Sequence, residues 1–72
     1  MDYFYNIFLD CDGEQEIKTY FIYHAKNGRY YERIHEERRR VGDKHFNVAY
    51  DGKIKRISEK AFVSAWETYK NA

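Results

Sequence analysis

The chain has 72 residues, which is enough for one small domain and leaves no room for a second. It is 43% hydrophobic, 19% aromatic and 35% charged, and this aromatic content excludes an intrinsically disordered chain. Its single cysteine, Cys11, excludes an internal disulfide, and no apolar run approaches the roughly 20 residues of a membrane span. The N-terminus lacks the basic region of a signal peptide. We therefore expect one domain over residues 1–72, without a membrane segment, in a reducing cytoplasmic setting.

Charge is distributed unevenly along the chain. Residues 1–16 contain five acids and no Lys or Arg, whereas residues 17–72 contain all 13 basic residues and only seven acids. Such an asymmetry indicates either a charged partner or pairing between the two regions within the fold. The sequence leaves both readings open.

Two strands are predicted at the N-terminus. Residues 3–9 are aromatic and β-branched and end at the turn-rich segment 10–13, and residues 16–24 form the second strand, antiparallel to the first. The odd positions of the first strand form its more apolar face: Tyr3, Tyr5, Ile7 and Leu9. Phe4 and Phe8 on the other face indicate that both sides of the strand are at least partly covered.

Residues 45–57 predict a hairpin, because both halves alternate around Asp51-Gly52. A three-residue loop with Gly52 in the left-handed position pairs Val48 with Ile54, and keeps apolar side chains together. In that register Lys53 and Lys55 project on the opposite face.

A helix is predicted over residues 58–70. Ser58 is a good N-cap, and Phe62, Trp66 and Tyr69 recur at helical spacing. Ile57 and Phe62 occupy the two positions of a hydrophobic staple.

Residues 30–41 are ambiguous. Asn27-Gly28 predicts a hairpin that leads into a further strand, whereas residues 32–40 consist mostly of helix-forming types. The fold class is therefore α+β, with an antiparallel sheet of about four strands packed by the C-terminal helix. The middle segment is either another strand of a meander or a second helix in a ββαββα order.

The string Ile7-Phe8-Leu9-Asp10-Cys11-Asp12-Gly13 resembles the first signature of the haloacid dehalogenase superfamily. The resemblance implies a nucleophilic Asp10 and an acid/base Asp12 that work with magnesium. However, Glu14 replaces the expected small residue, the later motifs have no counterparts, and 72 residues cannot build that family's parallel sheet. A plain loop, capped by Gly13, is the expected structure.

No metal or cofactor site is predicted. The acids Asp10, Asp12, Glu14 and Glu16 do not have the spacing of a calcium loop, and the three histidines share no ligand spacing with one another or with Cys11. We expect a non-enzymatic protein in which these four acids form a secondary acidic face for docking.

Basic and aromatic residues provide the binding candidates: Tyr30, Tyr31, Arg33, Arg38, Arg39, Arg40, Lys53 and Lys55. Cations interleaved with rings suit nucleic acid, and a three-stranded sheet followed by a helix resembles in architecture the sheet-reading DNA-binding domains of phage integrases. Glu32, Glu36 and Glu37 interrupt the patch, and the isoelectric point of about 7.8 is lower than such domains usually show. Nucleic-acid binding is therefore the alternative function.

The first expectation is a protein-binding domain, because Tyr and Arg are enriched at interface hot spots and the chain has eight Tyr and six Arg. In type it resembles accessory proteins of phages and mobile elements that inhibit a host protein or defence complex, anti-CRISPR proteins included. Homodimerisation through an edge strand or through the tyrosine-bearing face of the sheet is compatible with so small a core. Packing is expected to use Tyr69, Tyr3, Tyr5 and Tyr50, which leaves Tyr30 and Tyr31 for binding.

Overall fold

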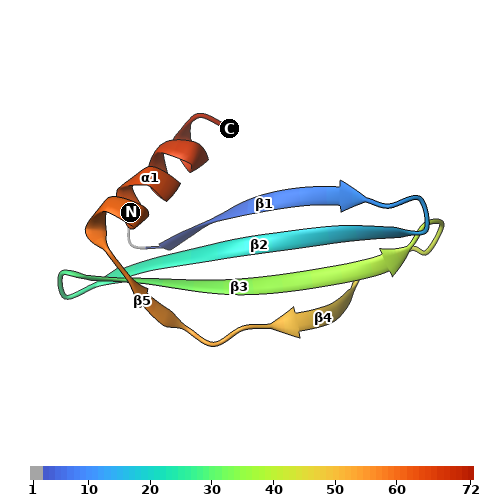
Figure 1. Ribbon diagram of the computed structural model, residues 1–72, viewed down its shortest axis with the longest axis horizontal. Coiled ribbons are helices and arrows are strands. Elements are labelled where there is room, and N and C mark those ends of the chain that lie inside the picture. Colours follow the sequence, from blue (N-terminus) through green and yellow to red (C-terminus); the bar gives the residue numbers. More distant parts are fainter. Residues whose placement is uncertain (1–2) are drawn as a thin grey trace.

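The computed structural model describes residues 3–72, and its elements follow the chain in a simple meander (Figure 1). Three long antiparallel strands come first: β1 (Tyr3–Cys11), β2 (Gln15–Lys26) and β3 (Arg29–Arg40). Two short strands follow, β4 (Asn47–Asp51) and β5 (Lys55–Ile57), and the helix α1 (Glu59–Lys70) ends the chain. The predicted α+β class, with an antiparallel sheet packed by a C-terminal helix, is confirmed. Asp2, one of the five N-terminal acids, lies outside the described residues.

The ambiguous middle segment is a strand, and the predicted second helix is wrong. Asn27 and Gly28 both adopt positive φ, at 54° and 72°, as a tight two-residue hairpin turn requires. From this turn β3 pairs with β2 without interruption, from Arg29 opposite Lys26 to Arg40 opposite Gln15. The hydrogen-bonded pairing of β3 with the whole length of β2 outweighs the helical propensity of the charged residues. Strand preference depends more on such context than on composition.

The predicted hairpin over residues 45–57 does not form. Instead β4 and β5 run in one direction along the same edge of β3, β4 beside residues 35–38 and β5 beside residues 30–32 (Figure 1). Gly52 lies between them, and its N–H donates to the carbonyl of Ile34 at 2.8 Å. Its φ is not positive, so the expected left-handed loop and the Val48–Ile54 pair are both wrong. The long β3 offers a bare edge, and both segments bond to it rather than to each other.

Helix α1 begins where the sequence predicts. The Ser58 side chain accepts a hydrogen bond from the backbone N–H of Ala61 at 3.1 Å, which satisfies one of the free donors of the first turn. Ile57 packs against the cluster that contains Phe62, as expected of the hydrophobic staple. In the part of the chain that the structure describes, no helix is long and apolar enough to cross a membrane.

The core lies where α1 crosses one end of the sheet. Phe4 is at its centre, with its ring centroid 5.1–5.3 Å from the rings of Tyr23, Phe62, Trp66 and Tyr69. The predicted packing of the helix through Phe62, Trp66 and Tyr69 is therefore confirmed.

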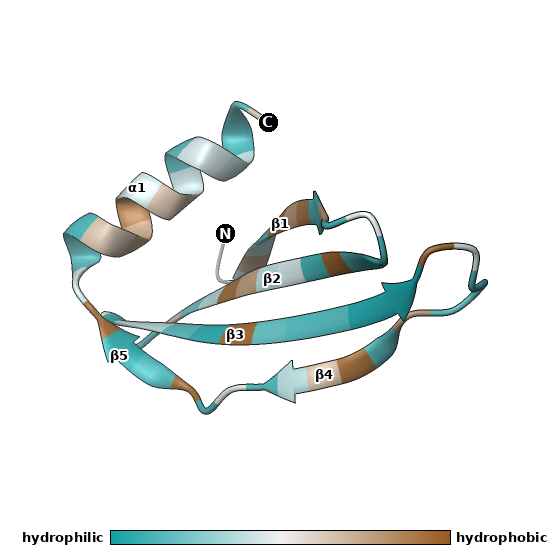
Figure 2. Ribbon diagram, turned by 45° about the vertical axis from the view of Figure 1, so that its right-hand side comes forward, coloured by the Kyte–Doolittle hydropathy of each residue, from teal (hydrophilic) through white to brown (hydrophobic). Residues whose placement is uncertain are grey.

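The expected packing of Tyr3, Tyr5 and Tyr50 is wrong. The even residues Phe4 and Asn6 face the helix, and the Asn6 side chain donates to the carbonyl of Ala65 at 3.1 Å. The odd residues are exposed on the other face, and Tyr50 is exposed as well. A helix of 12 residues is about 18 Å long, so α1 covers one face of one end in a molecule whose longest dimension is 43 Å. In Figure 2 β1 is coloured largely as hydrophobic and β3 mostly as hydrophilic, with β2 between them.

Candidate functional site: the open face of the sheet

Among residues 3–72, no helix or strand packs on the face of the sheet opposite α1, and we call it the open face. The strand register places on it the odd-numbered residues of β1, the even-numbered residues of β2 and the odd-numbered residues of β3. It therefore collects most of the large side chains that do not contribute to the core. These side chains come from three long strands and are held by a continuous ladder, so the surface is a rigid one.

Aromatic rings cross the open face from strand to strand. The ring centroids of Tyr5 and Tyr20 are 5.9 Å apart, and those of Tyr20 and His35 are 5.4 Å apart. Tyr3 meets His24 edge-on at 5.3 Å. Such tilted and edge-to-face contacts are favourable and fix the rings in place. Beside them Ile7 and Leu9 of β1 extend the row as exposed aliphatic side chains.

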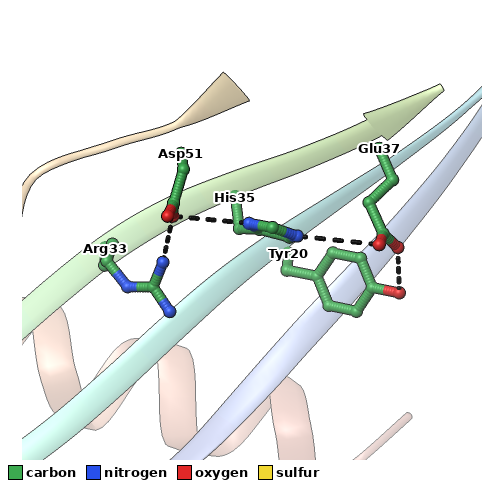
Figure 3. A network of polar contacts seen from close by, with 5 residues as sticks. All are labelled: Tyr20, Arg33, His35, Glu37 and Asp51. Carbon is green, nitrogen blue, oxygen red and sulfur yellow. Dashed lines mark hydrogen bonds and ion pairs between the residues drawn. The ribbon is translucent and has the colours of Figure 1, made fainter. Parts of the chain in front are cut away.

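A polar network lies next to these rings (Figure 3). The Tyr20 hydroxyl donates to Glu37 at 2.7 Å, and the His35 ring lies between two carboxylates, with Nε2 3.7 Å from Glu37 and Nδ1 3.4 Å from Asp51. Arg33 forms an ion pair with the same Asp51. The hydrogen bond to Glu37, followed by burial, raises the pKa of Tyr20 above its usual value. The phenol therefore keeps its proton, and the network orients side chains from β2, β3 and β4 on one surface.

The predicted binding residues divide between the two faces. Tyr31, Arg33 and Arg39 lie on the open face by register. Tyr30 lies on the helix side, and its ring centroid is 4.7 Å from that of Phe62, so it contributes to packing.

The other four predicted residues lie on the helix side or at the edge of the sheet. Arg38 and Arg40 are on the helix face by register, and Lys55 is in β5 opposite Glu32. Lys53 falls in the connection between β4 and β5.

Most of the predicted basic residues are already neutralised by the fold. Four ion pairs involve them, with Nε of Arg38 at 2.6 Å from Glu36 and Nζ of Lys55 at 3.3 Å from Glu32. The other two pairs are Arg33 with Asp51, and Arg39 with Glu16. Of these four pairs, one joins the acidic residues 1–16 to the basic remainder of the chain, that of Arg39 with Glu16, and the other three lie within residues 17–72.

The acidic loop and the arginine run meet at one end of the sheet. Arg39 lies opposite Glu16 in the register, and the N–H of Val41 donates to the carbonyl of Glu14 at 2.9 Å. Asp12 accepts the backbone N–H groups of Gln15 and Glu14 at 2.8 and 3.0 Å, and these bonds hold its pKa below the usual value. Asp12 thus acts as the cap of the β1–β2 turn. Among residues 3–72, no three His, Cys, Asp or Glu side chains come together as a metal site would require.

Phe46 was not singled out in the sequence, and it covers the same end of the sheet. Its ring lies 4.3 Å from Nζ of Lys18 and 4.4 Å from Cζ of Arg39, as in cation–π pairs. An open cavity of about 500 Å³ lies beside it, lined also by Leu9 and Cys11. Tyr5, Ile7 and Tyr20 were missed as surface residues as well, although the alternation of β1 did place Tyr5 and Ile7 on one face.

Comparison of this chain with protein-family models, with curated proteins and with solved structures finds no match. The functional argument therefore rests on the geometry of the open face.

Proposed function

We propose that this protein is a non-enzymatic binding domain that docks on another protein through its open face. The observation that carries the proposal is the row of exposed apolar and aromatic side chains on a face that no element in the described part of the chain covers: Tyr3, Tyr5, Ile7 and Leu9, with the rings of Tyr20 and His35 beside them. A contiguous apolar surface with a polar border is typical of an interaction site.

The electrostatics favour a protein partner. Arg33 and Arg39 lie on the open face with their charges paired to Asp51 and Glu16, so these two arginines add hydrogen-bonding groups to it with little net charge. Tyrosine and arginine held in fixed positions lose little conformational freedom when a partner binds. A partner with an apolar centre and a polar border fits this surface, and occlusion of that partner's own site would make the domain an inhibitor.

Site-specific photo-crosslinking tests this proposal. A photoreactive amino acid is placed at Tyr31 on the open face, and in a control variant at Val63, which is exposed on the helix. After irradiation in cells that produce the protein, mass spectrometry should identify a heterologous protein joined through position 31 and absent from position 63. Equal adducts from both positions, or none from position 31, would contradict the proposal.

One observation favours a second candidate, nucleic-acid binding. The turn end of the open face carries three cations, Lys26, Arg29 and Arg56, and in the described part of the chain none of the three forms an ion pair. Tyr31 lies beside them, opposite Arg56 in the register. Unpaired cations next to a half-buried ring provide phosphate contact and a surface for base stacking.

The two candidates differ in their dependence on salt. Binding of short DNA and RNA duplexes and single strands is measured at about 50 mM and about 200 mM salt, where contacts to several phosphates weaken steeply. If the second candidate holds, the double variant Arg29→Ala/Arg56→Ala loses that affinity, and Lys60→Ala on the helix retains it. Absence of binding at the lower salt concentration rules this candidate out.

A further inference from the structure

The two edges of the sheet differ in how they are protected. On the β3 side the edge is formed by the short strands β4 and β5, it contains a register shift at Glu36/Glu37, and it carries Lys53, Lys55 and Arg56. Short strands, bulges and lysines are the features by which proteins prevent one sheet edge from pairing with another.

The β1 edge has none of these features. β1 pairs with β2 over nine residues without a bulge, and it contains no Lys, Arg or Pro. Its one charged residue is Asp10, and its odd residues are exposed and apolar. A long edge strand with a single charge and no bulge pairs readily with another strand.

The backbone of β1 has a defined pairing pattern. In an antiparallel pair, residues bond to the neighbouring strand alternately, and the N–H of Asp12 donates to the carbonyl of Gln15 at 3.1 Å. The even residues of β1 are therefore the ones that bond to β2. Its odd residues from Tyr3 to Leu9 direct their N–H and C=O groups to the free edge. The same odd residues carry the exposed apolar side chains. The N–H of Cys11 instead donates to Oδ1 of Asp10 at 2.8 Å, which leaves its C=O for a partner.

We propose that this edge binds β1 of a second copy of the chain, antiparallel, across a two-fold axis at Ile7. The backbone groups that are directed outward belong to odd residues, so an odd residue of one copy must face an odd residue of the other. The sum of two facing residue numbers is then even, and the two-fold axis must pass through a residue of β1 rather than between two residues. An axis at Ile7 pairs all nine residues of the strand.

The neighbouring axes pair fewer residues. An axis at Asn6 leaves Asp10 and Cys11 without partners, and an axis at Phe8 leaves Tyr3 and Phe4 without partners.

This register also brings compatible side chains together. On the open face Ile7 faces Ile7 of the second copy, and Tyr5 faces its Leu9, so an aromatic ring lies against an aliphatic chain, a favourable cross-strand pair. Asp10 faces Phe4 of the second copy, so no two like charges lie opposite each other. The added strand continues the sheet, and the open faces of the two copies join into one surface. This inference stands independently of the partner proposed above.

An interface made of one strand pair buries less surface than the roughly 1,600 Å² of a standard interface. A dissociation constant in the micromolar range is therefore expected. Sedimentation velocity of the wild-type protein between about 10 µM and about 1 mM should show a monomer–dimer equilibrium. A protein that stays monomeric over this range overturns the proposal, and leaves the edge to a strand of a different protein.

A matched pair of variants locates the interface. Ile7 and Val63 are exposed to similar extents, 44% and 46%, on β1 and on the helix. Ile7→Lys sets two ammonium groups opposite each other and should weaken the dimer at least about tenfold, whereas Val63→Lys should not change it. Circular dichroism verifies that each variant is folded, and Leu9→Lys replaces Ile7→Lys if that variant is not. Equal effects at positions 7 and 63 contradict the proposal.

Disulfide trapping tests the register in a Cys11→Ser background, because Cys11 is free and exposed. Opposite residues that exchange hydrogen bonds in an antiparallel pair have Cα atoms about 5.5 Å apart, which is within the range that a disulfide spans. Ile7→Cys should form a covalent dimer under mild oxidation. Tyr5→Cys alone should not, but should do so when combined with Leu9→Cys. Efficient trapping through Tyr5→Cys alone overturns the two-fold axis at Ile7.

Discussion

Phe4 and Phe8 lie on the same face of the same strand, and they provide a stringent test of where the core is. Phe4 is 2% exposed beneath α1, whereas Phe8 is 53% exposed beyond the helix. Phe4 contacts four other rings, and Phe8 has one aromatic neighbour, Phe21, at a centroid distance of 5.4 Å. The two replacements Phe4→Ala and Phe8→Ala are chemically identical and differ only in what covers the side chain.

The expected costs differ several-fold. Replacement of a buried phenylalanine by alanine costs about 3–5 kcal/mol. A side chain already half exposed loses about half of the roughly 2 kcal/mol gained on full burial, which gives about 1 kcal/mol for Phe8→Ala. The total stability of a 72-residue domain is roughly 4–11 kcal/mol, so Phe4→Ala should remove a large part of it.

Urea denaturation measured through Trp66, the single tryptophan and a neighbour of Phe4, gives the two values directly. With a slope of about 1 kcal/mol per molar urea, the midpoint should fall by about 3 M or more for Phe4→Ala and by about 1 M for Phe8→Ala. If Phe4→Ala does not fold, Phe4→Leu provides the comparison at a smaller cost, about 1.5 kcal/mol. Equal losses at the two positions would refute the view that α1 organises the core at one end of the sheet.

Three further predictions concern the helix cap, the β4–β5 junction and alkaline pH. Ser58→Ala should lower the free energy of unfolding by about 1 kcal/mol, because Ser58 accepts the N–H of Ala61, and Ser58→Asp should retain most of it in the same urea assay. Gly52→Ala should cost about 1–3 kcal/mol by thermal denaturation, since the added Cβ would lie 2.9 Å from the carbonyl oxygen of Ile34; a neutral result would contradict this close approach. Burial raises the pKa of Tyr23 well above its usual value of 10, so the fold favours the neutral phenol. Its contribution is complete below pH 10 and is lost as the pH rises further, and unfolding midpoints between about pH 8 and pH 11 should fall less for Tyr23→Phe than for the wild type.

The parts of the fold that follow from local chemistry could be predicted from the sequence. Ser58 begins the helix because its side chain can cap it, and Asn27-Gly28 forms the turn because both residues tolerate positive φ. The first two strands follow from their aromatic and β-branched residues. In each of these cases the evidence lies within a few residues of the feature that it predicts.

The parts that depend on distant partners could not be predicted in this way. Residues 32–40 are helix formers by type, and only the full-length ladder with β2 makes them a strand. The alternation around Asp51-Gly52 suits a hairpin, but the free edge of β3 receives both segments instead.

The expected packing of Tyr3 and Tyr5 of β1 was wrong for a related reason. Its odd residues are the more apolar, but the face that packs is decided by the rings of Phe62 and Trp66, which meet Phe4. The candidate site was therefore only partly foreseen. Tyr31, Arg33 and Arg39 lie on the open face, whereas Tyr5, Ile7 and Tyr20 had been left out of the predicted binding residues.

The exposure of the open face also explains why so small a protein has so many tyrosines. A single short helix can bury one end of one face, so the other end and the whole open face must be built from side chains that are stable both in water and against a partner. Tyrosine meets this requirement, because its ring packs against neighbours while its hydroxyl remains hydrated or bonded, as Tyr20 is to Glu37. On this sheet the rings of Tyr5, Tyr20 and His35 are held by cross-strand contacts and by the hydrogen bond of Tyr20 to Glu37 rather than by a second layer. The stability of the covered end thus supports a surface that contributes little to the core, which is the arrangement that a binding domain of this size requires.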